Sequence, residues 1–182
     1  MIVDWAATAM LVVFVVAFVA KARSAQAFDD FAPSLSQFGI GSITAQRFTA
    51  AAVLGLEAVA SVGLLLAHHP LVRFALPIAL LAVFSAGVAL GARAGRLSAC
   101  HCFGTSTTLP TRPHLALNGS LAALGCAAVL AGGAAGSTGE SVLGIGLGII
   151  TGVLFVGSAD LYTALSTAGT APGRGAVSEK VG

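Results

Sequence analysis

Long apolar segments, separated by short polar ones, make up most of this sequence. Five segments approach or reach the ~20 residues that a helix needs to cross a bilayer. They run over residues 5–20, 48–67, 74–92, 115–135 and 141–165. We therefore expect an all-α fold, a polytopic transmembrane helical bundle of about five spans. Four helices would form its core, and a fifth helix would be added to that core. We expect one domain over residues 1–166 and, because residues 167–182 are rich in Gly, Ser and Thr, a disordered tail.

The first apolar segment is short for a span. Its sixteen residues rise ~24 Å as a helix, so we expect Trp5 and a snorkelling Lys21 to mark its ends. Ala20-Lys21-Ala22 resembles a signal-peptide cleavage site. A signal peptide begins with a basic region, however, and here Asp4 precedes the apolar run without any Lys or Arg. We therefore expect this segment to be retained as a span.

Between the first two spans, residues 24–47 mix apolar and polar side chains. Large apolar residues recur there at a helix-like spacing: Phe28, Phe31, Leu35 and Phe38. Pro33 interrupts this pattern. The pattern predicts an amphipathic segment lying on the membrane surface.

Composition supports a membrane protein. Of the 182 residues, 57% are hydrophobic and 9% are charged, against roughly 25% charged in soluble domains. The mean hydropathy is +0.95. Sixteen charged side chains cannot cover a soluble surface, which excludes a free cytosolic enzyme, a nucleic-acid-binding protein and a disordered chain. The net charge of +2 is too small to indicate a polyanionic partner, so the first expected partner is the lipid bilayer.

The basic residues are distributed unevenly between the two sides of a five-span protein. Arg73 is alone on the side that holds the N-terminus. The other eight lie on the opposite side: Lys21, Arg23, Arg47, Arg93, Arg96, Arg112, Arg174 and Lys180. Because cytoplasmic loops carry the excess of Lys and Arg, we expect the N-terminus outside the cell membrane. The segment 93–114 and the C-terminus are then cytoplasmic.

That polar segment contains the sharpest motif of the chain, Cys100-His101-Cys102-Phe103-Gly104. Two cysteines in C-x-C spacing can close a small, strained disulfide ring, which is easily reduced and suits a redox carrier. An imidazolium at His101 would favour the reactive thiolate. The same thiols could instead bind a soft metal ion together with His101.

Two other interpretations of the pair are open. A stable zinc site needs four ligands, and the nearest further candidates are His114 and Asp160. The two cysteines could also be unrelated small residues in a loop. Redox exchange is favoured because Cys is rarely placed in a polar loop without a chemical reason. Cys126, within an apolar span, is expected to be a packing residue.

Glu57 lies ten positions into a twenty-residue span, close to the bilayer midplane. An ionised carboxylate there costs roughly 2.5 kcal/mol or more, so it must be protonated, paired or in contact with a polar cavity. One interpretation is a proton acceptor for thiol chemistry, or a group that lines a quinone or substrate pocket. The other is a structural contact with Ser61, Ser85 or Asn118.

Polar and small residues of the last two spans complete the set of candidates. His114 and Asn118 could hydrogen-bond the motif loop, tune a thiolate or cap the helix. Gly144, Gly148 and Gly152 form two overlapping GxxxG steps, which allow close helix packing. Packing within one chain is favoured over a dimer face, and a homo-oligomer stays possible.

Several of these features occur in the order seen in a known family. The sequence resembles the family of the methylamine-utilisation protein MauE, within the wider DoxX-like group. The matching features are the basic exit from the first span at Lys21 and Arg23, Glu57 in the second span, the Cys100–Gly104 motif and Asn118. The resemblance covers about residues 5–135. The family motif usually reads Cys-Gly-Cys-Phe-Gly, so His101 departs from it.

The resemblance implies a membrane thiol–disulfide redox protein with a thioredoxin-like partner, or a maturing disulfide-containing protein as its partner. It also implies a quinone as a possible cofactor. The catalytic residues expected are Cys100, Cys102, His101 and Glu57. One rival is a soft-metal transporter or chaperone that uses Cys100, Cys102 and His101, and another is a non-catalytic membrane assembly subunit. Disulfide formation belongs outside the cytoplasm, which conflicts with the charge asymmetry.

Overall fold

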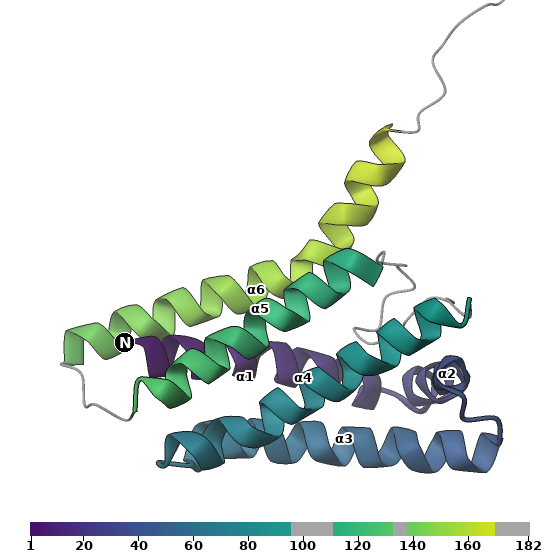
Figure 1. Cartoon of the computed structure of the whole chain (residues 1–182), viewed down its shortest axis with the longest axis horizontal. Coiled ribbons are helices and arrows are strands. Elements are labelled where there is room, and N and C mark those ends of the chain that lie inside the picture. Colours follow the sequence, from purple (N-terminus) through teal and green to yellow (C-terminus); the bar gives the residue numbers. More distant parts are fainter. Residues whose placement is uncertain (96–110, 133–137, 170–182) are drawn as a thin grey trace, which may run out of the picture.

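The computed structural model describes residues 1–95, 111–132 and 138–169, and within these ranges the regular secondary structure is helical (Figure 1). Six α-helices and one 3-10 helix occur there, without a strand. Five of the helices are long and apolar enough to cross a membrane. The expected all-α bundle of about five spans is confirmed.

The five membrane-spanning helices extend beyond the apolar segments at several ends. They are α1 (Ile2–Ala22), α3 (Ile43–Leu66), α4 (Pro70–Arg93), α5 (Thr111–Leu130) and α6 (Thr138–Gly169). Residues with polar side chains enter their first or last turns, because a helix needs backbone hydrogen bonds rather than apolar side chains. The part of α6 with a membrane-spanning composition is Thr138–Ser158. Its later turns project away from the other helices (Figure 1).

Consecutive spans run in opposite directions, so the described connections lie at two ends of the bundle (Figure 1). The N-terminus, the α3–α4 turn and the start of α6 lie at one end. The ends of α1 and α4 and the starts of α3 and α5 lie at the other. These two ends of the bundle correspond to the two sides to which the Lys and Arg residues were assigned from the sequence. Which side is cytoplasmic stays a prediction.

Helix α1 is the central element, because it packs against α6, α3 and α5. The buried apolar side chains of the main core come from every spanning helix and include Met10, Phe14, Leu64, Phe74, Leu81, Leu121 and Phe155. Many other leucines, isoleucines and valines are exposed on the outer faces of α3, α4 and α6. Such an apolar exterior is typical of helices that face lipid.

The contact between α1 and α6 depends on three glycines. Gly144, Gly148 and Gly152 of α6 face the α1 backbone at a one-turn spacing. A Cβ at Gly148 would lie 2.8 Å from Trp5 O, and one at Gly152 would lie 3.1 Å from Ala9 O. The GxxxG steps therefore pack within one chain, as favoured from the sequence, and this glycine face is covered.

A methyl group added at this contact is expected to destabilise the fold. Gly148→Ala should lower the free energy of unfolding by about 1–3 kcal/mol, because the helices must move apart. The matched control is Gly146→Ala, where a Cβ meets nothing within 4 Å and the residue is exposed. Alanine there should stabilise α6 by up to about 1 kcal/mol. Thermal unfolding in detergent measures both, and equal stabilities for the two variants would contradict this packing.

The segment between the first two spans forms α2 (Ala25–Ser34) and the 3-10 helix η1 (Leu35–Phe38). Ser24 caps α2, since its Oγ accepts a hydrogen bond of 3.0 Å from Ala27 N. The apolar face packs on α3 through a small cluster of Phe31, Ala32, Leu35 and Ala50. The expected amphipathic helix is confirmed, while its position on the membrane surface stays a prediction.

Candidate functional site

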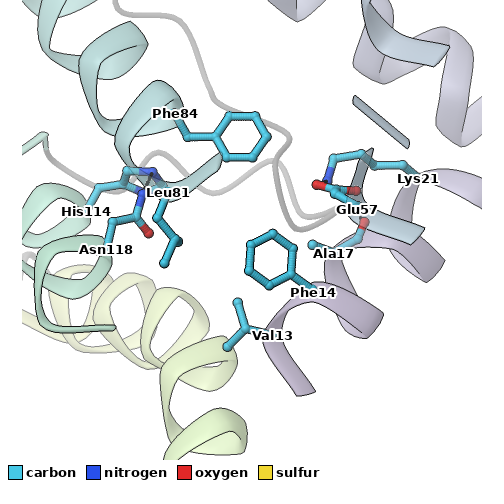
Figure 2. Close-up of a pocket in the computed structure, with 9 residues that line it drawn as sticks. All are labelled: Val13, Phe14, Ala17, Lys21, Glu57, Leu81, Phe84, His114 and Asn118. Carbon is cyan, nitrogen blue, oxygen red and sulfur yellow. Dashed lines mark hydrogen bonds and ion pairs between the residues drawn. The ribbon is translucent and has the colours of Figure 1, made fainter. Parts of the chain in front are cut away.

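A buried ion pair joins α1 to α3. Lys21 Nζ lies 2.7 Å from Glu57 Oε1, and each side chain is only 2% exposed (Figure 2). Lys21 comes from the last turn of α1, and Glu57 lies within α3. Taking two charges out of water is costly, so such a pair persists only when each charge neutralises the other.

The structure corrects the expectation that Lys21 snorkels to the membrane surface. Its side chain instead turns into the bundle, because the Glu57 carboxylate provides a charge partner there. Nζ also donates to Ala17 O at 3.1 Å and lies 5.2 Å from the centroid of the Phe31 ring, a cation–π contact. Phe31 belongs to α2, so the amphipathic helix covers one side of the ion pair.

The structure also identifies a partner for Glu57 that sequence reasoning missed. Ser61 was one of the expected partners, but its Oγ donates at 2.8 Å to the main-chain oxygen of Glu57. The carboxylate contacts Lys21 instead. One sequence signal could have found the pair, since an acid within a span requires a compensating base and Lys21 directly follows the first apolar segment.

The second carboxylate oxygen of Glu57 is unsatisfied. Oε2 is buried and has no hydrogen-bond partner among the described residues. An unsatisfied buried polar atom loses its hydration without compensation, which costs about 1–3 kcal/mol and more for a charged group. Such an atom in a native structure therefore needs a further partner.

A cavity next to the ion pair lies among α1, α3, α4 and α5 (Figure 2). The cavity is small, with a volume of about 40 Å³, and it is partly open to its surroundings. The lining residues are Val13, Phe14, Ala17, Lys21, Glu57, Leu81, Phe84, His114 and Asn118. Most of the wall is apolar, with Lys21 and Glu57 on one side and His114 and Asn118 on the other (Figure 2).

His114 and Asn118 form the second polar group of the cavity. They lie one turn apart at the start of α5, and both are buried. His114 Nε2 and Asn118 Nδ2 are 3.4 Å apart. Three residues singled out from the sequence, Glu57, His114 and Asn118, therefore line one cavity although they come from two helices.

The other candidates are not brought to this cavity by the described structure. Cys100, His101 and Cys102 lie outside the described residues, as does the side chain of Asp160.

Cys126 is exposed on α5, so the expectation that it packs inside the chain is wrong. The buried face of that helix turn is formed by Gly125 and Ala128 instead. Within the described ranges, no three His, Cys, Asp or Glu side chains form a group that could hold a metal ion.

The cavity combines groups that exchange protons. A carboxylate, an ammonium group and an imidazole surround one small space in an apolar bundle. Side chains of these types act as general acids and bases when they are held in position. The arrangement is therefore suited to holding and moving protons inside the membrane-spanning region.

Comparisons with known proteins bear on the same part of the chain. The model of one protein family, described as Methylamine utilisation protein MauE, matches residues 1–132. The match spans α1 to α5, and therefore both polar groups of the cavity and the Cys100–Gly104 motif. Searches of curated proteins and of solved structures gave no match.

Proposed function

Because the chain belongs to the family of the methylamine utilisation protein MauE, we propose that this multi-pass membrane protein carries out thiol–disulfide exchange. Its redox pair is Cys100 and Cys102. Its partner is a thioredoxin-like protein or a maturing disulfide-containing protein. The observation that carries the proposal is the C-x-C motif with its adjacent His101, inside the residues that match the family.

The exchange proceeds in two steps. One cysteine loses its proton, and its thiolate attacks a sulfur of the partner disulfide. The partner S–S bond breaks, a mixed disulfide forms, and the departing partner sulfur takes up a proton. The second cysteine then attacks the mixed disulfide. The products are a Cys100–Cys102 disulfide and a partner dithiol, so two electrons and two protons have passed to the partner.

The reverse direction would oxidise a partner dithiol and leave Cys100 and Cys102 reduced. A membrane quinone is the candidate acceptor for the two electrons in that case. When the chain reduces its partner, an imidazolium at His101 favours the attacking thiolate, and in the reverse direction it stabilises the thiolate that leaves the Cys100–Cys102 disulfide.

The position of the motif in the chain supports the proposal. Residues 96–110, which contain the motif, connect the end of α4 with the start of α5. These two helix ends lie at the same end of the bundle as the end of α1, which carries Lys21 (Figure 1). His114 follows Cys102 by twelve residues and lines the cavity. Proton-exchanging groups thus lie near the helix ends that hold the motif segment.

Alkylation of thiols before and after incubation with an oxidised or reduced thioredoxin-like protein tests the proposal. Cys100 and Cys102 of the purified chain should change together between dithiol and disulfide. Exchange that is unchanged in the Cys100→Ser/Cys102→Ser variant would contradict the proposal. A soft metal that binds stoichiometrically, without redox cycling and only when both cysteines are present, would support a metal chaperone. An intact membrane complex that shows neither thiol–disulfide exchange nor metal binding would support the role of an assembly subunit.

The orientation of the chain decides which compartment supplies the partner. The eight-to-one distribution of Lys and Arg predicts a cytoplasmic motif. A membrane-impermeant maleimide added to intact cells should therefore leave reduced Cys100 and Cys102 unlabelled. It should label His68→Cys, in the α3–α4 turn, in a background without other cysteines. Labelling of the motif from outside would reverse the topology and place disulfide formation in the oxidising compartment.

A further inference from the structure

The cavity beside the ion pair has a size and a set of polar groups that fit a small cluster of water molecules. Its volume is about 40 Å³, and the space is wide enough to admit water. A buried water needs at least ~10–15 Å³, so the cavity has room for a small number of water molecules. A cavity that binds a benzene-sized ring is larger, about 150 Å³. The space therefore favours water over an aromatic ligand.

The polar groups of the cavity match the hydrogen-bonding needs of water, which typically makes two to four hydrogen bonds when buried. Glu57 Oε2 is a buried acceptor that has no partner among the described residues. Lys21 has three N–H donors, and two of them bind Ala17 O and Glu57 Oε1. Across the cavity, Asn118 and His114 provide further donors and acceptors.

We propose that this cavity is a hydrated proton-binding site, in which water hydrogen-bonded to Glu57 Oε2 links the Lys21–Glu57 pair to His114 and Asn118. These are the titratable and polar groups of the described cavity wall, and Val13, Phe14, Ala17, Leu81 and Phe84 surround them. A proton taken up at His114 can therefore reach Glu57 through a few hydrogen bonds.

The site would serve the thiol chemistry, and this part of the inference rests on the proposed function. Thiol–disulfide exchange has no net proton change, but the attacking thiol must first lose a proton and the departing thiolate must gain one. A site that stores one proton between the two events meets both needs. Lys21, Glu57 and His114 store the proton and Asn118 positions the water, and none of these residues forms or breaks a bond to sulfur.

Infrared difference spectroscopy of the full chain in nanodiscs tests the site. Exchange from ordinary water to H₂¹⁸O should shift O–H stretching bands of bound water. Transfer to D₂O should shift a carboxyl or carboxylate band that disappears in Glu57→Leu/Lys21→Met. Ala17→Val adds two methyl groups to the cavity wall, so it should remove the bound-water bands. Its matched control is Ala51→Val at an exposed position of α3, which should retain them.

A second variant covers the case in which Ala17→Val fails to fold. Asn118→Leu removes one polar partner of the water, whereas Ser120→Ala removes an exposed hydroxyl two residues further along α5. Asn118→Leu should weaken the bound-water bands, and Ser120→Ala should not. Bound-water bands that are missing from the wild type, or retained in folded Ala17→Val and Asn118→Leu, would overturn the proposal.

The exchange rate separates this proposal from the redox function. In folded Ala17→Val, thiol–disulfide exchange should be roughly 100-fold slower than in the wild type. This is the lower end of the rate effect of a positioned acid or base. An unchanged rate would overturn the proton role. The Cys100→Ser/Cys102→Ser variant should lose exchange and keep the bound-water bands. If the wild type shows the bound-water bands but no thiol–disulfide exchange, the hydrated site is supported and the redox function is rejected.

Discussion

Replacing Lys21 with methionine is expected to lower the free energy of unfolding by about 3–5 kcal/mol, because it leaves the buried Glu57 carboxylate without its counter-charge. Glu57→Leu should have a similar cost, since it leaves a buried ammonium group. The double variant Lys21→Met/Glu57→Leu should recover most of the loss, because two packed apolar side chains replace a pair that is costly to desolvate. Unfolding in mixed detergent measures all three variants.

The exposed ion pair of Asp29 and Arg47 provides the matched control. Its atoms are 2.8 Å apart, but both side chains are more than half exposed. Arg47→Met should therefore cost no more than about 1 kcal/mol. A double-mutant cycle compares the two pairs, and a coupling energy near zero for Lys21 and Glu57 would contradict a buried, mutually neutralising pair.

This pairing changes how a substitution of Glu57 must be interpreted. Glu57→Gln alone keeps the shape of the side chain but leaves Lys21 charged and without its counter-charge. Loss of activity in that variant could follow from loss of folded protein. The double variant Lys21→Met/Glu57→Gln removes both charges, so activity measured in that background reports the proton role more directly.

Substitution of either motif cysteine is expected to abolish exchange, because one sulfur must attack and the other must resolve the mixed disulfide. Removing the resolving cysteine should also trap the partner in a covalent complex, visible as a high-mass band that reductant removes. Cys102 directly precedes Phe103-Gly104, where the sequence predicts a turn that would shield Cys102. We therefore expect Cys100 to be the more accessible attacker and Cys102→Ser to be the trapping variant.

His101→Gly is the matched control for the cysteine variants. It restores the residue that is usual in the family, and both sulfurs remain. Exchange should stay largely intact in this variant. No covalent complex from either single serine variant, together with full exchange in both, would exclude a two-cysteine mechanism.

The spans were predictable because a bilayer demands about 20 apolar residues, and few other folds leave such a pattern. Their ends were less predictable. Hydropathy begins the fourth span at residue 115, whereas α5 begins at Thr111, since the backbone pattern of a helix continues through Arg112 and His114. Packing of the α6 glycines within one chain was also favoured from the sequence, since small residues at a one-turn spacing permit close contact.

The ion pair was not predictable in the same way. Lys21 and Glu57 are 36 residues apart, and only the packing of α1 against α3 brings them together. Local pattern favoured snorkelling, because a Lys at the end of an apolar segment usually reaches for water. The shared cavity of Glu57, His114 and Asn118 has the same origin. Each residue was a candidate from the sequence, but their common site depends on tertiary packing.

Mass spectrometry of the peptide that contains Cys100 and Cys102 shows whether the two cysteines carry out thiol–disulfide exchange. The full chain in nanodiscs is incubated with an oxidised thioredoxin-like protein, and free thiols are then blocked before digestion. If the reduced cysteines exchange with the partner, the peptide should be unblocked and two hydrogens lighter, with a matching gain of thiols in the partner. A peptide that carries two blocked thiols after incubation with oxidised partners of this class would contradict the proposed redox function.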